Sequence, residues 1–496
     1  MKPSKYQIAI YKAFKETDHN LNISAVAGSG KTTVLLELLK FIPKNKTALF
    51  LAFNNSIVDE LKDRIERRDG IDIMTIHSYG WRSILSRYGN RAKMNPNKCL
   101  GKVEKVLKEY EEEIRATKRG YFFYIIPKII DLMRCNLTSL DVKEIAELAD
   151  HYDLNVGELE IEIAMKVFRL MNKDKAQYDF MDMIYQPIVD PIVRCKKYDY
   201  VFCDESQDFS VAQHAIIKNA LNRRGRLITV GDERQAIYGF AGADAESYEK
   251  LSTINGEALN LPLSVSYRCA KAIVREAQAI VPQISYAPNA EEGEVRSGSL
   301  TELHQGDWIV CRNLKPLVQA YLWLMKNKIK SKICGKEIGE GILSLISKTG
   351  AKTLHGLNVM LEIEQNRLLK KLRSRGVSKP SLHPKTEILN QKIEVIQCLM
   401  EEVGTVAQLK KLIEGIFTDE VQGILLSTIH KAKGLENERI FFLSPELIPS
   451  KYATQPWQYE QENNLKYVAL TRAKRELIYV WGNVFTRDIK GKIIIN

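Results

Sequence analysis

The sequence has no long apolar run and no strongly biased segment, and each of these absences excludes a class of protein. No uninterrupted apolar stretch reaches the roughly 18 residues that a membrane-spanning helix needs, so we expect no membrane partner. Low-complexity and fibrous repeats are missing, which excludes a disordered or collagen-like chain. The segment Met1–Lys5 is polar and leads straight into a helical pattern, so we expect no signal peptide.

Paired cysteines are missing as well. The eight cysteines are scattered along the chain, and no two of them form a Cys-x-x-Cys pair. Several lie in apolar runs typical of strands, such as Val201-Phe202-Cys203. This spacing favours buried free thiols over disulfides or zinc ligands. We therefore expect a protein of a reducing compartment, the cytoplasm.

What the sequence does contain is enough apolar residues for several globular domains. Its 496 residues are 45% hydrophobic and 27% charged. At roughly 150 residues per domain, this length suggests about three domains or subdomains. The 73 basic residues exceed the 61 acidic ones by 12. The excess favours a polyanionic partner, although a basic balance alone is weak evidence for nucleic acid.

Short apolar runs alternate with helical segments near both ends of the chain. Residues 23–27, 47–53, 200–203 and 226–230 are such runs, and the pattern recurs from Trp308 onward. Strand–helix alternation predicts α/β cores with parallel sheets covered on both faces, and the Lys-, Glu- and Leu-rich stretches between them predict helices. We expect two cores, each with a mainly helical insertion: residues 1–87 and 187–262 form the first core, 88–186 its insertion, 263–335 and 418–496 the second core, and 336–417 its insertion.

A glycine-rich segment follows the first strand and opens a helix, as a phosphate-binding loop requires. Its residues are Gly28-Ser29-Gly30-Lys31-Thr32. The glycines let successive backbone N–H groups face the phosphates of ATP, and the helix N-terminus adds a positive dipole end. Lys31 would reach the β- and γ-phosphates, and the Thr32 hydroxyl would bind Mg²⁺. The first glycine of the usual pattern is absent, and the alternative interpretation is a glycine-rich turn without a ligand.

Two carboxylates end the strand over residues 200–203. Because a carboxylate at the C-terminal end of a parallel strand points into the ligand crevice, Asp204 is predicted to hold Mg²⁺ and Glu205 to polarise the attacking water. The alternative is a solvated acidic turn. The next strand ends in Gly231–Gln235, which alone would be a polar loop. Arg268 and Arg472 would alone be surface arginines, yet hydrolysis needs a cation on the γ-phosphate.

These residues, in this order, resemble the UvrD/Rep/PcrA family of superfamily 1 DNA helicases. The similarity runs from Gln7 to Arg475 through separate motifs. They are Tyr6-Gln7, Ala27–Thr32, Ala52–Asn55, Thr75–Ser78, Asp204–Asp208, Val230–Phe240, Ser266–Arg268, Thr428–Glu436 and Tyr467–Ala473. The resemblance implies two RecA-like phosphate-loop domains. It further implies an ATPase that moves on single-stranded DNA in the 3′ to 5′ direction and unwinds duplexes, as in DNA repair.

The resemblance also implies a role for each residue of the nucleotide site. The catalytic residues would be Lys31, Glu205, Gln235, Arg268 and Arg472, with Gln235 sensing the γ-phosphate and Arg472 acting as arginine finger. The nucleotide would contact Gln7, Gly28, Ser29, Gly30, Lys31, Thr32, Thr33, Tyr267 and Glu436. Thr32 and Asp204 would bind Mg²⁺. Thr33 departs from the family because many members carry an arginine there.

Single-stranded DNA would cross both cores and stack on aromatic faces. The candidate DNA contacts are Phe53, Asn54, His77, Phe240 and His430. Asn54, Ser56 and Ala241 replace residues usual in the family, so DNA would be held differently there.

Three functions stay open at this point. The first is a helicase, the second a single-strand translocase that unwinds poorly, and the third a slow ATP-controlled switch. The short second insertion keeps the second alternative open. We expect binding to single-stranded DNA and to single/double-strand junctions, no C-terminal nuclease domain, a monomeric or weakly self-associating chain, and a nucleoid or phage-host setting.

Overall fold

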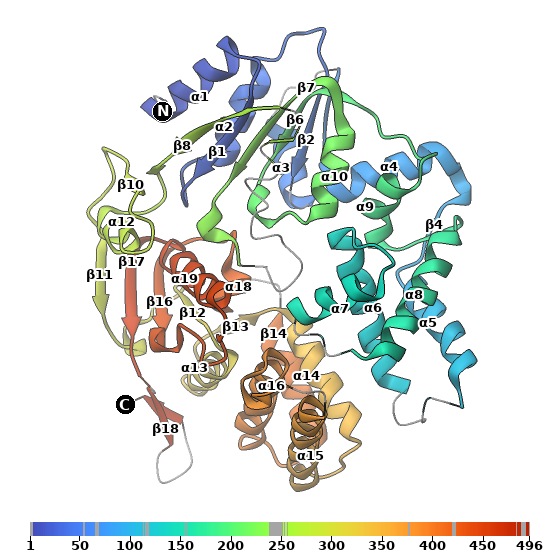
Figure 1. The fold of residues 1–496 in the computed structure, drawn as a ribbon. Coiled ribbons are helices and arrows are strands. Elements are labelled where there is room, and N and C mark those ends of the chain that lie inside the picture. The colour runs from blue at the N-terminus through green and yellow to red at the C-terminus, as the bar shows by residue number, and fades with distance from the viewer. Residues whose placement is uncertain are drawn as a thin grey trace. The chain divides into compact units, whose positions relative to one another are not determined.

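The computed structural model places most of the chain in two compact units, Met1–Ser264 and Val265–Asn496 (Figure 1). We call them unit 1 and unit 2. The residues that the structure describes are 3–52, 55–64, 69–112, 114, 119–152, 154, 156–237, 251, 253–254, 256–374, 377–418, 423–482, 484–487 and 493–495.

Unit 1 is built on one parallel sheet of six strands. The strand order is β3-β2-β6-β7-β1-β8, and every neighbouring pair is parallel. The strands that flank the centre come from distant parts of the sequence, so residues near position 25 and near position 204 end at the same edge. The strands are β1 (Asn20–Ala25), β2 (Ala48–Ala52), β3 (Ile71–Thr75), β6 (Tyr198–Cys203), β7 (Leu221–Gly231) and β8 (Ala258–Leu263).

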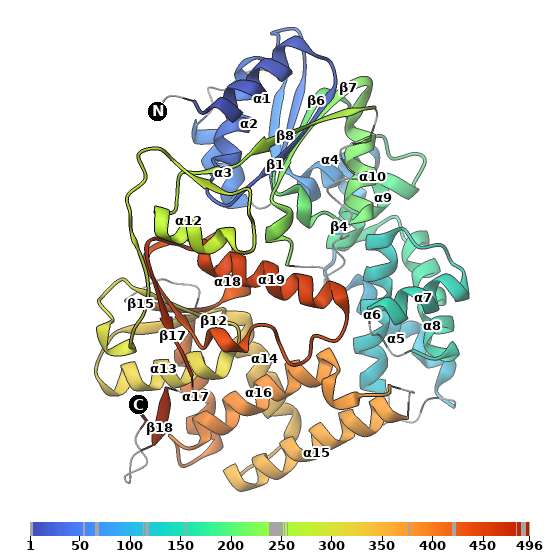
Figure 2. The same cartoon turned by 60° about the vertical axis from the view of Figure 1, so that its left-hand side comes forward.

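Alternate side chains of these strands enter two different hydrophobic cores, as the two-residue period of a strand requires. Phe50 and Phe202 pack with α1 (Lys5–Glu16) and α2 (Lys31–Lys40) on one face. Their neighbours Leu49 and Val201 pack on the other face, with α4 (Ile76–Tyr88), α9 (Phe180–Val189) and α10 (Val211–Ala220). Figures 1 and 2 show these two helical layers. Another helix of unit 1 is α3 (Asn55–Arg64).

The first insertion is helical and has a core of its own. Its helices are α5 (Lys98–Leu107), α6 (Arg119–Asn136), α7 (Val142–His151) and α8 (Glu158–Lys173). Buried ion pairs join it to α9: Lys98 Nζ lies 2.6 Å from Asp182 Oδ2, and Arg134 Nη1 lies 2.8 Å from Asp179 Oδ1. Segments near the two ends of this insertion pair as short parallel strands, β4 (Lys93–Met94) with β5 (Gln177–Tyr178).

Unit 2 is built on a second parallel sheet, in the order β11-β17-β16-β12-β15-β13-β14. The strands are β11 (Glu294–Ser297), β12 (Trp308–Cys311), β13 (Ser331–Cys334), β14 (Phe417–Thr418), β15 (Ile424–Thr428), β16 (Asn437–Leu443) and β17 (Ala473–Val480). Helices α12 (Lys271–Gln278), α13 (Leu314–Lys326), α18 (Ile429–Ala432) and α19 (Pro456–Leu470) accompany the sheet. Two parallel α/β sheets confirm the predicted fold class.

Shorter strands complete unit 2. A parallel pair, β9 (Val265–Ser266) with β10 (Ser285–Tyr286), opens it. An antiparallel pair, β18 (Phe485–Arg487) with β19 (Ile493–Ile495), lies near its end and packs on α13. All eight cysteines of the chain are free thiols. No helix among the described residues is long and apolar enough to cross a membrane.

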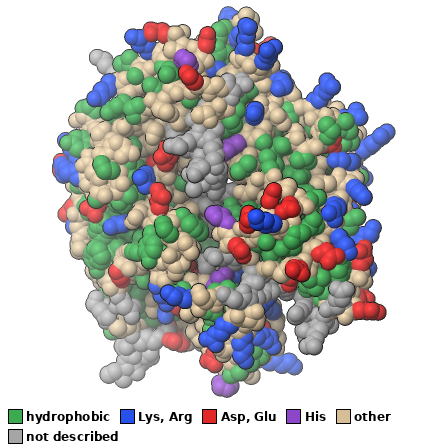
Figure 3. Space-filling view, viewed as in Figure 1, with side chains coloured by type: hydrophobic (Ala, Val, Ile, Leu, Met, Phe, Trp, Pro, Cys, Tyr) green, Lys and Arg blue, Asp and Glu red, His purple; other side chains and the backbone are tan. Residues whose placement is uncertain are grey.

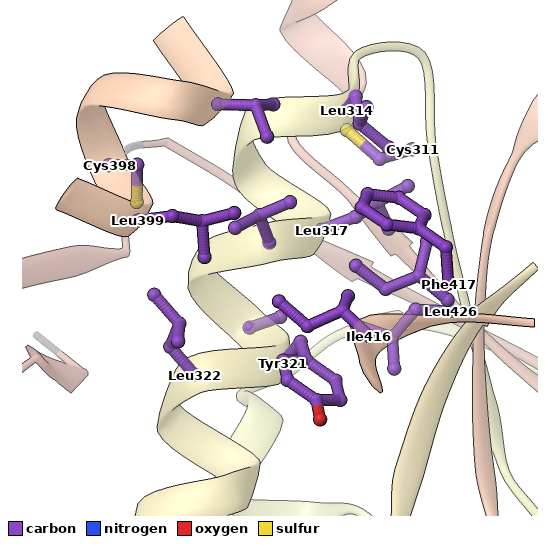
Figure 4. Close-up of a cluster of buried hydrophobic side chains, with 14 of the residues drawn as sticks. Cys311, Leu314, Leu317, Tyr321, Leu322, Cys398, Leu399, Ile416, Phe417 and Leu426 are labelled. Atoms are coloured by element: carbon purple, nitrogen blue, oxygen red, sulfur yellow. The ribbon is translucent and has the colours of Figure 1, made fainter. Parts of the chain in front are cut away.

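The second insertion shares its hydrophobic core with the sheet of unit 2. It consists of α14 (Lys336–Thr349), α15 (Leu354–Arg373), α16 (Pro384–Met400) and α17 (Val406–Ile416). One continuous cluster contains side chains of these helices together with those of α13, β12 and β15. In Figure 4, Leu399 of α16 lies on one side of α13, while Phe417 and Leu426 lie on the other. The insertion is therefore part of the second core and not a separately packed body.

A buried ion triad adds to this attachment. Arg312 directly follows β12, and its Nη1 lies 2.9 Å from Glu387 Oε1 of α16. Its Nη2 lies 2.8 Å from Glu462 Oε1 of α19. The three side chains are only 10–13% exposed.

The outer surface of the second insertion carries basic side chains, which Figure 3 shows gathered over α14–α16. Lys348 of α14 and Arg367 of α15 are each 66% exposed, and each lies 2.7 Å from a carboxylate oxygen of Glu364.

Candidate functional site

The glycine-rich loop lies between the C-terminal end of β1 and the first turn of α2. Gly28 has φ 70° and Gly30 has φ 80°, a left-handed conformation that favours glycine. Gly30 is the N-cap of α2 and supplies no side-chain cap, so the first N–H groups of the helix stay available to an anion. Lys31 and Thr32 begin the helix. The local sequence therefore builds a positively polarised cradle at the edge of the sheet.

Two carboxylates that follow β6 contact this cradle. Lys31 Nζ forms an ion pair with Glu205 Oε1 at 2.6 Å. The Thr32 hydroxyl donates a hydrogen bond to Asp204 Oδ2 at 2.9 Å. The structure thus brings together Lys31, Thr32, Asp204 and Glu205, the four residues predicted to act on ATP and Mg²⁺. Asp204 is 2% exposed, so the alternative of a solvated acidic turn is wrong.

The charged groups at this edge are buried, and they lie close enough to shift one another's pKa values. Burial raises the pKa of Asp204 to about 6, with the charge of Glu205 adding to the effect. Burial likewise raises the pKa of Asp232 to about 6. Burial alone would lower the pKa of Lys31, but the charges of Glu205, Asp204 and Asp232 outweigh it and the pKa is raised. Lys31 is therefore a cation among three acidic groups.

The donor set fits a hard divalent cation that is also bound by phosphate oxygens. Thr32 and Asp204 offer oxygen ligands side by side, and a single lysine faces the three carboxyl groups of Asp204, Glu205 and Asp232. Within the described residues, no group of three or more His, Cys, Asp or Glu side chains could form a complete metal site by itself. This arrangement is typical of Mg²⁺, which uses one or two protein oxygens together with substrate phosphates.

Gln207 connects this site to the loop after β7. Its side-chain amide donates to Glu205 Oε2 at 2.6 Å, and its oxygen accepts from the N–H of Asp232 at 3.0 Å. Asp232 Oδ2 in turn accepts from Gln235 Nε2 at 2.6 Å. Glu205 has φ 52°, a left-handed conformation that is rare outside glycine and often found at functional sites. Gln207 lies within the motif Asp204–Asp208, but the motif alone predicts no role for it.

Gln7 lies next to the phosphate loop. It forms a capping box with Ser4 at the start of α1, in which Ser4 N–H donates to Gln7 Oε1 at 2.9 Å. A Cβ placed on Gly30 would lie 3.9 Å from Gln7 Nε2 and 3.8 Å from Thr33 Cβ. The predicted nucleotide contacts of unit 1 therefore surround Gly30. Ser29 is fully buried, whereas Thr33 is exposed.

The predicted nucleotide contacts of unit 2 also lie together. Arg268 forms an ion pair with Glu436, and its Nη1 donates to the Thr471 carbonyl oxygen at 3.2 Å. Lys474 Nζ lies 3.0 Å from Glu436 Oε1. Burial would raise the pKa of Glu436, but Arg268 and Lys474 hold it below its usual value. Tyr267, half-buried, directly precedes Arg268.

Arg472 is among the largest fully buried side chains of the described residues and is 1% exposed. Its Nε donates to the Val468 carbonyl oxygen and its Nη1 to that of Leu435, both at 3.0 Å. The composition-based alternative of a surface arginine is therefore wrong for Arg472. Its guanidinium joins α19 to the segment that carries Glu436.

The candidate DNA contacts are only partly described. Phe53, Asn54 and Phe240 lie outside the described residues. His77 lies in the first turn of α4, and burial lowers its pKa. His430 lies in α18, where burial and, to a smaller extent, the charge of Arg312 lower its pKa to about 4. His430 is therefore neutral at pH 7.

The fold and this site define the class of protein, and comparison with known families names it. Residues 9–254 match the UvrD/REP helicase N-terminal domain, and residues 360–483 match the UvrD-like helicase C-terminal domain. The chain therefore belongs to the UvrD/Rep/PcrA type of superfamily 1 helicases, which confirms the resemblance stated above.

Individual relatives carry the name ATP-dependent DNA helicase PcrA. The chain is 28% identical to that protein of Bacillus subtilis (strain 168) over 289 residues, which is 54% of this chain and 38% of the relative. It is 26% identical to that of Staphylococcus aureus (strain Mu50 / ATCC 700699) over 294 residues, which is 54% of this chain and 39% of the relative. The matches thus span about two fifths of the length of these relatives.

Proposed function

We propose that the protein is an ATP-dependent DNA helicase that moves on single-stranded DNA in the 3′ to 5′ direction. The observation that carries the proposal is the joining of Lys31, Glu205, Asp204 and Thr32 at the carboxyl edge of one parallel sheet. Phosphoryl transfer to water needs an anion cradle, a cation, a metal-ligating hydroxyl and a carboxylate near that hydroxyl. The family relatives are named as ATP-dependent DNA helicases.

ATP binding would rearrange the Lys31–Glu205 ion pair. The phosphates would enter the cradle at the start of α2, where Lys31 would turn from Glu205 to the β- and γ-phosphates. This exchange frees one oxygen of Glu205, which could then accept a proton from the attacking water. Thr32 and Asp204 would hold Mg²⁺, which would supply positive charge to the transferred phosphoryl group.

Unit 2 would supply further contacts to the nucleotide during turnover. Arg268 would exchange Glu436 for the γ-phosphate, and Arg472 would act as the arginine finger. Tyr267 would stack on the adenine. A nucleotide that draws on residues of both RecA-like cores would couple its hydrolysis to their movement, and alternating grip on DNA would produce directional steps.

The partner would be single-stranded DNA, including its junctions with duplex. Phe53, Asn54, His77, Phe240 and His430 would line its path, with aromatic stacking worth about 1–3 kcal/mol per base. Because basic residues exceed acidic ones by 12, binding should weaken steeply with salt. We propose that the chain is monomeric or weakly self-associating. We also propose that its two cores and two insertions have the residue boundaries expected from the sequence.

The first test is the rate of ATP hydrolysis with and without single-stranded DNA at low salt. Strong stimulation supports a DNA-coupled motor, and a rate that DNA does not raise would favour the slow switch. Strand displacement is then measured on duplexes with a 3′ or a 5′ single-stranded tail. Displacement only from the 3′ tail supports the proposal, whereas stimulated hydrolysis without displacement would point to a translocase.

A further inference from the structure

Gln207 is buried, with 2% of its surface exposed, and the nitrogen and the oxygen of its side-chain amide have different partners. It lies in the 3-10 turn Ser206–Asp208, immediately after Glu205. Its nitrogen donates to Glu205 Oε2 at 2.6 Å and to Asp208 Oδ2 at 3.3 Å. Its oxygen accepts from the Asp232 N–H at 3.0 Å. Because a carboxylate only accepts and a backbone N–H only donates, these partners fix the orientation of the amide.

The two oxygens of Glu205 depend on different partners. Oε1 pairs with Lys31, which the proposed ATP binding would draw away, whereas Oε2 is held by Gln207. The contact with Gln207 requires no movement of the phosphate loop. Glu205 can therefore keep its orientation at the moment when its other oxygen is needed by water.

The same glutamine reaches the loop that carries Gln235. Asp232, whose N–H it binds, accepts the Gln235 amide at 2.6 Å. Gln207 thus spans the ends of β6 and β7, two neighbouring strands. A shift of either loop would therefore be transmitted to the other through the Gln207 side chain.

We propose that Gln207 is a positioning residue for ATP hydrolysis, which holds the Glu205 carboxylate and the Gln235 loop in one fixed arrangement around the attacking water. The inference rests on the proposed function. Glutamine suits the role because its side chain has a donor and an acceptor at the same distance from the backbone. Glutamate in this place keeps the acceptor for Asp232 N–H but repels Glu205, and methionine of similar length loses both contacts.

The activities of two variants test the inference. Gln207→Glu and Gln207→Met are compared with the wild-type full chain by kcat and KM for ATP with saturating single-stranded DNA, and by the Kd of a non-hydrolysable ATP analogue. We expect kcat to fall by about 10–100-fold in both variants, because each loses the contact with Glu205 and misplacement of a reacting group can cost about 10²-fold. KM and Kd should stay within about twofold, because neither contact is made to the phosphates.

A structural role alone predicts a different result. If Gln207 served only to hold the Asp232 backbone, Gln207→Glu would retain activity and Gln207→Met would lose it. A wild-type kcat in Gln207→Glu, or in both variants, would overturn the inference while wild-type hydrolysis still supported the proposed function. A wild-type protein without ATP hydrolysis would overturn both.

A matched control lies in the next helix. Gln213 closes the capping box of α10, where its Oε1 accepts from Ser210 N–H at 2.7 Å. Glutamate serves equally well in a capping box, so Gln213→Glu should leave kcat unchanged. Thermal unfolding of all variants shows whether a fall in kcat comes with loss of the fold.

Discussion

Replacing Arg312 by methionine would test how firmly the second insertion is attached to the core of unit 2. Arg312 is 10% exposed and pairs with two carboxylates that are almost as buried, Glu387 on α16 and Glu462 on α19. Removing one member of a buried ion pair leaves an uncompensated charge and costs about 3–5 kcal/mol. We therefore expect Arg312→Met to lower the free energy of unfolding of unit 2 by about that amount.

The size of the effect can be expressed as a shift in the unfolding midpoint. Unit 2 spans 496 − 264 = 232 residues. For a domain of that size each kcal/mol shifts Tm by about 2–4 °C, so the expected loss is about 6–20 °C. Tryptophan fluorescence reports mainly on this unit, since four of the five tryptophans lie in it: Trp308, Trp323, Trp457 and Trp481.

Acidification should reduce the defect. Burial raises the pKa of Glu387, and the charge of Arg312 partly opposes this. Without Arg312 the folded-state pKa rises further above the unfolded value of 4.5, so the lost stability is largest above the folded pKa and shrinks as pH falls through it. The Tm loss of Arg312→Met should therefore be smaller at pH 5 than at pH 8.

An exposed ion pair of the same unit provides the control. Arg275 Nη2 lies 2.6 Å from Glu292 Oε1, but the two side chains are 52% and 61% exposed. Arg275→Met should change stability by about 0–1 kcal/mol, as is typical of surface pairs. Equal losses in Arg312→Met and Arg275→Met, or a loss that grows on acidification, would refute the reasoning about burial.

Further predictions concern the nucleotide and DNA sites. Lys31→Ala should abolish ATP hydrolysis and weaken nucleotide binding, whereas Glu205→Gln should abolish hydrolysis and retain binding; wild-type turnover in Glu205→Gln would exclude Glu205 as the base. His430 should stay neutral in an NMR titration from pH 8 to pH 5, because burial lowers its pKa to about 4. Since a depressed histidine pKa removes stability as pH falls below 6.5, His430→Gln should flatten the acid side of the stability profile, provided the fold is kept. Phe240→Ala should reduce the stimulation of hydrolysis by DNA and spare the basal rate, and unchanged stimulation would argue against stacking.

The fold class and the family could be predicted because their signals are local. The strand at 200–203, the loop at 28–32 and the carboxylates at 204 and 205 can each be read from a few neighbouring residues. Strand–helix alternation then requires parallel sheets, whose carboxyl edges collect such residues. The roles given to the individual site residues stay predictions.

Other features could not be predicted because they depend on residues far apart in the chain. The hydrogen bond between Gln207 and the Asp232 N–H requires the register of β6 against β7. The burial of Arg472 depends on the carbonyl group of Leu435, which no motif spacing reveals. The packing of α16 on α13 likewise follows from shape and volume, which a helical pattern alone does not contain.

The shared cluster of α13 and α16 restricts how this chain can be altered. An insertion with its own core can be removed, or exchanged between relatives, because its removal exposes little buried surface of the remaining domain. Removal of residues 336–417 would instead remove packing neighbours of Leu317, Leu322 and other side chains that are fully buried in unit 2. Grafts at this position would need to reproduce the inner face of α16 and not only the two ends of the insertion. Natural substitutions in this segment should therefore fall on the outer helix faces. Substitutions of the inner residues should be accompanied by compensating substitutions in α13.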